Sequence, residues 1–305
     1  MKNIPFEIDS EKTEAFLASV DHNAYNRAME RARKMSGSAS LDSRPVKTQL
    51  YHDNFQNYKR YNIPKAQLVI ADIPYNIGAN FYGSNPTWYI GGDRKNGESK
   101  HAGKAAFHSD FNFNIAEYFH FCNKLLKKEP KSSNGRGKSS DAPCMIVFCA
   151  FEQIESVKAY AAKYGFQNSI PLVFCKNYSP QVLKANMRIC GATEYALVLY
   201  RGKLPKFRNN GKMVFNWFEW KRDSGKEYPK IHPAQKPVGV LKRLIEIFTD
   251  PGDVVIDPCA GSGSTLRACM ELGRNSYGFE IDKDFYEKAQ SQMLSRKNEQ
   301  ISLKL

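Results

Sequence analysis

The sequence predicts an α/β fold in which a parallel sheet is covered by helices on both faces. Short apolar runs, such as residues 67–71 and 145–149, lie between segments with helical periodicity. This alternation is typical of parallel sheets that are buried on both faces. It is clearest between residues 238 and 296, where helical segments and short strands follow one another closely. No internal repeat is visible.

The first half of the chain is predicted to hold helices, strands and two long loops. A helix over residues 10–35 starts at Ser10, a good N-cap residue, and the Gly- and Ser-rich stretch 36–40 ends it. Residues 76–110, rich in Gly, Asn and Ser, and residues 129–143 are predicted as loops. The other expected elements are strands at 47–51, 67–71 and 145–149 and helices at 113–126 and 153–164.

The second half of the chain ends in a regular alternation of short elements. Residues 201–231 show no clean period, so no element is assigned to them. After them the apolar spacing changes repeatedly between helical and extended. The predicted elements are strands at 172–174 and 195–200, a helix at 238–248, a strand at 254–256, a helix at 265–272, a strand at 276–281 and a helix at 285–296.

The composition is that of an ordinary soluble globular protein, with 42% apolar and 25% charged residues. No run approaches the roughly 18 apolar residues of a membrane span, and residues 1–7 lack the apolar core of a signal peptide. The seven cysteines are odd in number and none are spaced as C-x-x-C, so neither a disulfide framework nor a metal site is expected. The expected location is the cytoplasm, without membrane contact.

The charge of the chain predicts a polyanionic partner. The formal net charge is +14, and a field of this sign favours nucleic acid. Residues 176–230 hold twelve Lys and Arg against four Asp and Glu, so this segment alone carries +8. It also contains Asn and Trp side chains, which can contact base edges or fill the gap left by a base. We therefore expect the segment to lie along DNA with an affinity that weakens as salt rises.

A glycine-rich turn follows one of the last strands. Residues 257–265, Asp-Pro-Cys-Ala-Gly-Ser-Gly-Ser-Thr, stand between a strand and a helix, where open α/β sheets bind ligands. Gly261 and Gly263 let the backbone turn tightly and approach a ligand closely. Glu280 ends the next strand, and a carboxylate there can accept hydrogen bonds from both ribose hydroxyls of a nucleoside. The turn therefore predicts a nucleoside cofactor.

Two other nucleotide-binding sequences are excluded by the same turn. A dinucleotide-binding turn would have a third Gly at position 266, where this chain has Leu266. The G-x-x-x-x-G-K-[ST] sequence of a phosphate-binding P-loop is absent. The cofactor is therefore expected to lack a pyrophosphate.

The sequence Asp72-Ile73-Pro74-Tyr75 follows a predicted strand and indicates the reaction. An exocyclic amine of a base is a poor nucleophile, because its lone pair is delocalised into the ring. Two acceptors aimed at its N–H groups, the Asp72 carboxylate and the Ile73 carbonyl, favour a tetrahedral nitrogen that can attack a sulfonium methyl. Tyr75 can stack on a base swung out of the helix. Pro74 keeps Ile73 out of the α region and so pre-aims its carbonyl.

Three blocks of the sequence resemble DNA amino-methyltransferases. Asp72 to Tyr75, followed by Asn76, resembles their D-P-P-Y signature, and Asp257 to Thr265 resembles their cofactor motif. His232-Pro233-Ala234-Gln235-Lys236-Pro237 resembles a third block, which helps to hold the methionine end of the cofactor. The signature precedes the glycine turn by 185 positions, which looks like the beta-type order of the family. The resemblance covers most of residues 47–296, and the general look is that of phage or prophage adenine methyltransferases.

The resemblance implies a Rossmann-like methyltransferase sheet covered by helices on both faces, with a smaller target-recognition lobe and S-adenosylmethionine as cofactor. The implied organisation is an N-terminal helical extension at 1–45, a catalytic half at 46–175, a target-recognition segment at 176–231 and a cofactor-binding half at 232–305.

The resemblance also implies the site residues. Asp72, Ile73, Pro74 and Tyr75 would be catalytic, and Lys236 would pair with the methionine carboxylate. Asp53 would contact the cofactor's adenine, with a place in a solvated loop or a role as a cap as the alternative. The expected cofactor-binding residues are Asp53, Lys236, Asp257, Cys259, Gly261, Gly263, Ser264, Thr265 and Glu280, and the expected DNA-binding residues are Lys176, Lys184, Arg188, Lys203, Arg208, Lys212, Lys221 and Arg222.

Three further positions refine the resemblance. Ile73 stands where the family usually has Pro, which is compatible with a role for its carbonyl alone. Pro258-Cys259 is like the nucleophile pair of cytosine-C5 enzymes but lies inside the cofactor turn, so Cys259 is expected to be a small loop residue. Glu194-Tyr195 also resembles a family block and is expected to be structural, with a role near the base pocket as the alternative.

The predicted function is site-specific methylation of adenine N6 in double-stranded DNA. Asp72 favours adenine, because cytosine-N4 enzymes more often carry Ser at that position. The alternatives are cytosine-N4 methylation, RNA methylation, and a catalytically inactive DNA-binding protein that keeps the methyltransferase fold. The sequence leaves open a homodimer, a restriction partner and the recognition sequence.

Overall fold

The structure of the protein is a computed structural model. The chain divides into two compact units, residues 1–45 and 46–305, and all described residues belong to the second. The helix predicted over 10–35 and the loop predicted over 76–110 lie outside them. The structure describes residues 46–75, 113–131, 140–176, 181–184 and 189–295.

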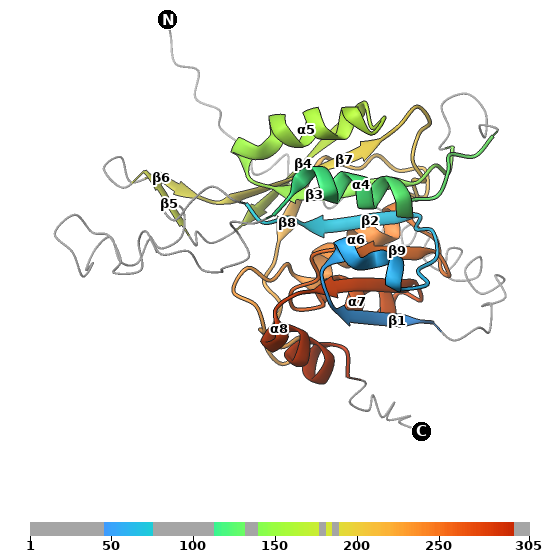
Figure 1. Ribbon diagram of the computed structural model, residues 1–305. Coiled ribbons are helices and arrows are strands. Elements are labelled where there is room, and N and C mark those ends of the chain that lie inside the picture. Colours follow the sequence, from blue (N-terminus) through green and yellow to red (C-terminus); the bar gives the residue numbers. More distant parts are fainter. Residues whose placement is uncertain (1–45, 76–112, 132–139, 177–180, 185–188, 296–305) are drawn as a thin grey trace, which may run out of the picture. The chain divides into compact units, whose positions relative to one another are not determined.

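The second unit is built on an eight-stranded sheet of order β1-β10-β9-β2-β3-β7-β4-β8 (Figure 1). The first five strands in this order are parallel to one another. β7 is antiparallel to both of its neighbours, and β4 and β8 are parallel to each other. The strands are β1 (Thr48–His52), β2 (Leu68–Asp72), β3 (Cys144–Cys149), β4 (Asn168–Lys176), β7 (Thr193–Tyr200), β8 (Trp217–Trp220), β9 (Val254–Asp257) and β10 (Asn275–Glu280).

The antiparallel strand β7 corrects the expectation of a wholly parallel sheet. Its residues Ala196 to Leu199 are buried between β3 and β4, with Val198 paired to Ile146 of β3 and to Ile170 of β4. An apolar strand buried on both faces has the same pattern whichever way it runs. Its direction was therefore not available from the sequence.

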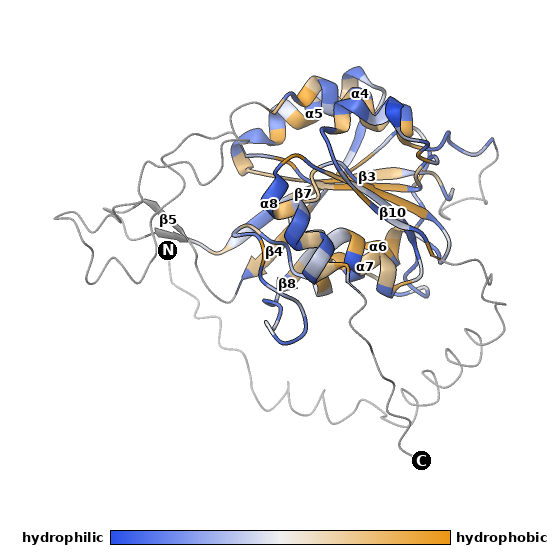
Figure 2. Ribbon diagram, turned by 60° about the horizontal axis from the view of Figure 1, so that its bottom comes forward, coloured by the Kyte–Doolittle hydropathy of each residue, from blue (hydrophilic) through white to orange (hydrophobic). Residues whose placement is uncertain are grey.

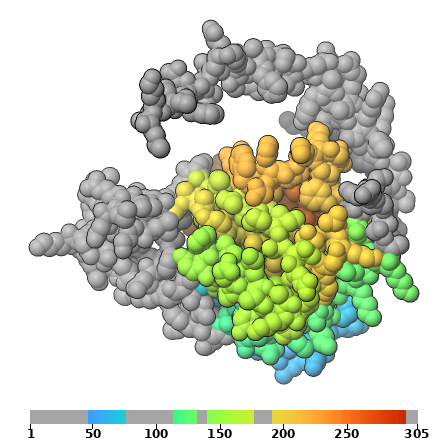
Figure 3. All heavy atoms as spheres, turned by 90° about the horizontal axis from the view of Figure 1, so that it is seen from above, coloured from blue at the N-terminus to red at the C-terminus, as the bar shows by residue number. Residues whose placement is uncertain are grey.

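Helices cover both faces of the sheet, as predicted (Figure 2). Val69 and Ala71 of β2 pack in one cluster with α4 (Ile115–Leu125) and α5 (Ile154–Lys163). Leu68 and Ile70, which point to the opposite face, pack in a second cluster with α6 (Val238–Phe248) and α7 (Ser264–Glu271). The face of the molecule that α5 covers is seen in Figure 3.

Local signals account for where the helices begin and end. The Asn114 side chain accepts hydrogen bonds from the amides of Ala116 and Glu117 and so caps α4. Gly165 follows α5 with a φ of 85°, a value that favours glycine. The helix predicted over 285–296 is instead α8 (Lys283–Lys288), followed by a π-helical turn (Ala289–Met293).

The segment predicted for target recognition, residues 176–231, is not separate from the main sheet. It contributes β7 and β8 to that sheet, and it also forms a two-stranded sheet from β5 (Gln181–Lys184) and β6 (Ile189–Gly191). β8 gave no sequence signal because it is a four-residue edge strand in which only Trp220 is buried. Within the described ranges no helix is long and apolar enough to cross a bilayer.

Candidate active site

The predicted site residues meet at one edge of the sheet, where the parallel strands end. Asp72 is the last residue of β2, Asp257 of β9 and Glu280 of β10. These three strands are adjacent, and the register pairs Val69 with Ile256 and Gly278 with Asp257. The tetrapeptide and the glycine turn, 185 positions apart in the sequence, therefore leave the sheet side by side.

The glycine turn is held mainly by backbone groups. The Ala260 amide donates to the Phe279 carbonyl (2.9 Å) and the Gly263 amide donates to the Ala260 carbonyl (2.8 Å). Gly261 and Gly263 have φ values of 51° and 76°, which residues with a side chain adopt only with strain. A Cβ on Gly261 would lie 3.9 Å from the His232 ring, so the turn and the block at 232–237 meet here.

Glu280 closes the turn from the neighbouring strand. Its carboxylate accepts hydrogen bonds from the amides of Gly261 (2.8 Å) and Asp282 (2.7 Å), one on each oxygen. A carboxylate oxygen has further lone pairs, so each can also accept from a hydroxyl group. Burial raises the pKa of Glu280 to about 7. Residues 257–265 with Glu280 thus leave acceptor capacity for the hydroxyl groups of a nucleoside, and their role as the cofactor site stays a prediction.

Burial raises the pKa of two other residues of the turn, Asp257 and Cys259. Asp257 is buried, which raises its pKa to about 7, and it accepts a hydrogen bond from the Cys259 amide (3.0 Å). Burial and the nearby Asp257 raise the pKa of the Cys259 thiol well above its ordinary value. A thiol is nucleophilic as its thiolate, so Cys259 is not suited to attack a base. Ser264 and Thr265 are buried at the start of α7.

The tetrapeptide is fixed at each of its last three residues. The Ile73 amide donates to the Phe148 carbonyl (3.2 Å), a bond that the proline of the usual family signature cannot make. The Pro74 carbonyl accepts from the Gln153 side chain (3.0 Å), and the Tyr75 hydroxyl donates to Glu194 (3.2 Å). Contacts from β3, the start of α5 and β7 therefore set the path of this segment.

A buried ion network joins the tetrapeptide to distant parts of the chain. The Lys236 ammonium lies 2.6 Å from an Asp72 carboxylate oxygen and 3.0 Å from a Glu194 oxygen. Glu194 also pairs with Lys176 through its other carboxylate oxygen, and it accepts from Tyr75. The side chains of Lys236 and Lys176 are each 8% exposed. The network therefore places two cations and two carboxylates beside the predicted base-binding residue.

The charges of the network stabilise one another. Burial alone would lower the pKa of Lys236, but the carboxylates of Asp72 and Glu194 outweigh it and hold that pKa above its ordinary value. Burial alone would raise the pKa of Glu194, but the ammonium groups of Lys236 and Lys176 hold it below its ordinary value. Lys236 and Glu194 are therefore both charged at neutral pH.

Three residues that the sequence singled out, Lys236, Asp53 and His232, can be compared with their surroundings in the structure. Lys236, expected at a cofactor carboxylate, contacts Asp72 and Glu194. Asp53 accepts hydrogen bonds from the Asn54 amide, Asn57 and Tyr61 (2.6–2.8 Å), which tie it to the short helical turn Phe55–Arg60, whose N-cap is Asn54. Its contact with the cofactor stays a prediction. His232, the first residue of the third block, has a pKa lowered to about 4 by burial and by Lys236, so its ring is neutral.

The expected DNA-binding residues fall into two groups. Lys203 and Arg208 have partners within the protein: Lys203 donates to the Pro130 carbonyl (2.5 Å), and Arg208 makes two 2.8 Å bonds to Asp250. With the buried Lys176 they are poorly placed to contact phosphates. Arg188 and the side chain of Lys184 lie outside the described residues. The exposed members are Lys212, Lys221 and Arg222, close in sequence to exposed Met213, Phe215 and Trp217.

The sequence reasoning missed two residues that organise the site, Glu194 and Gln153. Glu194 was noted in a family block and was expected to be structural, with a role near the base pocket only as the alternative. Gln153 gave no signal; its side chain accepts from the Ala150 amide (3.0 Å) and donates to Pro74. Both act on the tetrapeptide from more than 75 positions away, and sequence spacing carries no information about such contacts.

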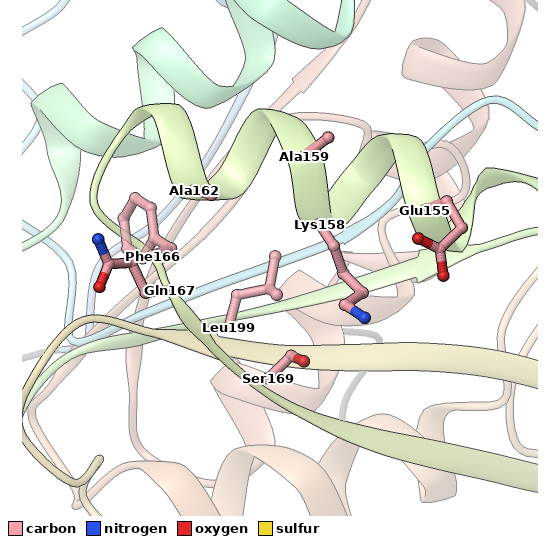
Figure 4. Close-up of a pocket in the computed structure, with 8 residues that line it drawn as sticks. All are labelled: Glu155, Lys158, Ala159, Ala162, Phe166, Gln167, Ser169 and Leu199. Atoms are coloured by element: carbon pink, nitrogen blue, oxygen red, sulfur yellow. The ribbon is translucent and has the colours of Figure 1, made fainter.

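A hollow of about 300 Å³ lies elsewhere, between α5 and strands β4 and β7 (Figure 4). It is lined by Lys158, Phe166, Ser169 and Leu199 among others. Leu199 pairs with Met145, near the start of β3, whereas Asp72 pairs with Phe148, near its end. The hollow therefore lies toward the opposite edge of the sheet from the tetrapeptide and is not part of this site.

Comparison with known proteins gives the same assignment as the geometry. The family model described as DNA methylase, of the N6/N4 type, matches residues 66–291, about three quarters of the chain. The DNA adenine methyltransferase YhdJ of Escherichia coli K12 is 29% identical over 255 residues, which cover 79% of this chain and 80% of that protein.

Solved structures share the fold at lower identity. The M1.HpyAVI–SAM complex superposes with a TM-score of 0.56 at 23% identity, covering 79% of this chain and 97% of that one. The cytosine-N4-specific PvuII DNA methyltransferase gives a TM-score of 0.55 at 16% identity, covering 85% of this chain and 92% of that one. Because the N4-specific enzyme has the same fold, the fold alone does not select the base.

Proposed function

The chain belongs to the N6/N4 DNA methylase family, and from this premise we propose that it methylates N6 of adenine in double-stranded DNA. Membership confirms the predicted DNA amino-methyltransferase, its Rossmann-like fold and S-adenosylmethionine as methyl donor. The observation that carries the proposal is the position of Asp72-Ile73-Pro74-Tyr75 on β2, next to the glycine turn after β9.

The residues of the tetrapeptide fit the demands of attack by an exocyclic amine. A carboxylate has about four acceptor sites, so Asp72 can keep its contact with Lys236 and still accept an N–H of the target amine. We propose that the Ile73 carbonyl accepts the other N–H and that Tyr75 stacks on the flipped base. The hydrogen bonds from the Ile73 amide to the Phe148 carbonyl and from the Gln153 side chain to the Pro74 carbonyl hold these groups in place before the base binds.

The proposed reaction is a direct displacement. When bound, S-adenosylmethionine supplies a methyl group whose C–S bond breaks as the amine nitrogen forms the new C–N bond, with the electron pair going to sulfur. The nitrogen then loses a proton, for which Asp72 is the nearest acceptor in the tetrapeptide. The proposed displacement needs no covalent bond between an enzyme residue and the base, and the raised pKa of the Cys259 thiol agrees with this.

Adenine is favoured over cytosine by two observations. Position 72 is Asp, whereas cytosine-N4 enzymes more often carry Ser there, and the relative that matches over most of its length is an adenine methyltransferase. We further propose that the exposed residues Lys212, Lys221, Arg222 and Trp217 belong to the DNA-contacting part of the segment 176–231. The domain organisation, the homodimer and the cytoplasmic location stay predictions.

The test is the identity of the methylated base. The purified protein would be incubated with methyl-labelled S-adenosylmethionine and duplex DNA, and the digested nucleosides separated by mass spectrometry. The proposal expects N6-methyladenine. N4-methylcytosine would instead establish the alternative base, label in RNA but not DNA would change the substrate, and donor binding without any methylated product would indicate an inactive DNA-binding protein.

A further inference from the structure

Glu194 receives three donors that come from three separate parts of the site. Lys236 and Tyr75 contact one of its carboxylate oxygens, at 3.0 Å and 3.2 Å, and Lys176 contacts the other. Lys236 in turn contacts Asp72 at 2.6 Å. Glu194 thus touches the base-stacking residue directly and the catalytic carboxylate through one lysine.

The charge of Glu194 balances this part of the site. Lys176 and Lys236 together carry two positive charges, and Asp72 and Glu194 carry two negative ones. A neutral side chain at 194 would raise the net charge of these four side chains from zero to +1. The methyl donor also carries a positive charge on its sulfonium sulfur, and like charges repel strongly where water is largely excluded. A surplus cation here would therefore oppose binding of the donor.

The loss of Glu194 would act on Asp72 as well. Lys236 is shared between two carboxylates, and without Glu194 the ammonium would be attracted to Asp72 alone. Asp72 would then be a weaker acceptor for the target amine. Tyr75 would lose the charged partner of its hydroxyl, which fixes the orientation of its ring.

We propose that Glu194 is a positioning residue of the methyl-transfer site, which divides Lys236 between two carboxylates, anchors Tyr75, and sets the charge balance that admits a sulfonium donor. This inference rests on the proposed function and deepens it. It develops the alternative that the sequence left open for Glu194, a role near the base pocket.

The experiment compares two ligands that differ in one charge. S-adenosylmethionine has a sulfonium, and S-adenosylhomocysteine has a neutral sulfur in its place. The Kd of each would be measured by calorimetry for wild type and for Glu194→Gln, which keeps the shape of the side chain and removes its charge. We expect the variant to bind S-adenosylmethionine about tenfold more weakly, with little change for S-adenosylhomocysteine.

Glu271→Gln provides a matched control. Glu271 also accepts from a tyrosine hydroxyl (Tyr228, 2.9 Å) and from two cations, Lys242 (2.9 Å) and Arg267 (2.5 Å). Its side chain is 21% exposed, against 16% for Glu194. It lies at the far end of α7 from the glycine turn. This variant should not change the ratio of the two Kd values.

A second variant tests the charge balance with the opposite sign. Lys176→Gln removes a cation, so it should shift the ratio of the Kd values in favour of S-adenosylmethionine, and the double variant Glu194→Gln/Lys176→Gln should return toward the wild-type ratio. The measurement on Lys176→Gln still tests the proposal if Glu194→Gln alone does not fold. Equal weakening of both ligands in Glu194→Gln, or an unchanged ratio in Lys176→Gln, would overturn the proposal. If wild type binds neither ligand, the proposed function fails instead.

Discussion

The two halves of the site are built from different kinds of groups. In the glycine turn, residues 257–265, backbone amides and carbonyls make most of the contacts, and the residues involved lie within about two dozen positions of one another. Around the tetrapeptide, side chains make most of the contacts, among them the buried charges, and Lys236 reaches Asp72 across 164 positions. A ligand-binding turn can therefore be formed by residues that are close in the sequence. The charged residues around Asp72, in contrast, are brought together only by the fold.

The largest expected effect is on kcat and comes from a substitution in the tetrapeptide, the half of the site that is surrounded by charged side chains. Asp72→Ala should lower kcat by about 10²–10³-fold, because it removes the acceptor that sharpens the amine. The affinity for S-adenosylhomocysteine should change little, because the glycine turn is untouched. Single-turnover kinetics and calorimetry check the two parts. If Asp72→Ala methylates DNA as fast as wild type, the proposed role of Asp72 is wrong.

The next largest effect is expected on stability and cofactor binding, from a substitution beside the glycine turn, the half of the site that is held mainly by backbone groups. A Cβ on Gly278 of β10 would lie 2.8 Å from a Leu266 methyl carbon and 3.1 Å from the Ala260 Cβ. Gly278→Ala should therefore push α7 and the glycine turn away from the sheet, lowering stability by ~1–3 kcal/mol and weakening cofactor binding. Urea unfolding and calorimetry measure the two changes.

Gly239→Ala is the matched control for that substitution. Gly239 lies in α6, and a Cβ there meets nothing within 4 Å. Alanine should leave the cofactor affinity unchanged and raise stability slightly, by about 0.4–1 kcal/mol. If both glycine variants behave alike, the close approach of α7 to β10 does not control the turn.

A smaller effect tests the departure from the family signature. Ile73→Pro restores D-P-P-Y but removes the amide that donates to Phe148 (3.2 Å). We expect a loss of about 1 kcal/mol of unfolding free energy with kcat within a few-fold of wild type, because the carbonyl of residue 73 is retained. Denaturant midpoints and initial rates measure these quantities. A large drop in kcat would show that the amide of residue 73 matters to catalysis.

A further expected effect is the pH dependence of the cofactor-free protein. The pKa of Glu280 is about 7 in the folded state, above its ordinary value, so the folded state favours the protonated form. This group makes no difference to stability below its unfolded pKa of roughly 4.3 and carries its full destabilising effect above pH 7. Between those limits stability should fall as pH rises.

Thermal midpoints at pH 5.5 and pH 8 would measure this effect. Glu280→Gln should reduce the fall between the two pH values. Glu271, whose pKa is held below its ordinary value by Lys242 and Arg267 despite burial, is ionised in both the folded and the unfolded state over this range, so it should contribute almost no pH dependence here. A pH dependence that is unchanged in Glu280→Gln would contradict the assignment of the fall to this carboxyl group.

Particular residues show how far prediction from sequence reached. Helix α6 occupies the predicted range 238–248, and the glycine turn, Asp72 and Glu280 lie together as expected, because each ends a strand of one sheet. Asp53 was expected at the cofactor's adenine, with a solvated loop or cap as the alternative; its hydrogen bonds to Asn57 and Tyr61 fix its local position, and the cofactor contact stays a prediction. The sequence allowed both roles, since an Asp after a strand suits either one.

Apart from short elements such as β5, β6 and β8, the sequence by itself determined the order of strands and helices, the glycine turn and the position of the tetrapeptide. Each of these depends on the conformational limits of Gly and Pro or on the spacing of apolar residues, which are local properties. Only the tertiary structure decided the direction of β7 and the partners of Lys236, Glu194 and Tyr75. Buried charges need opposite charges nearby in space, and a folded chain brings these together from any distance in the sequence.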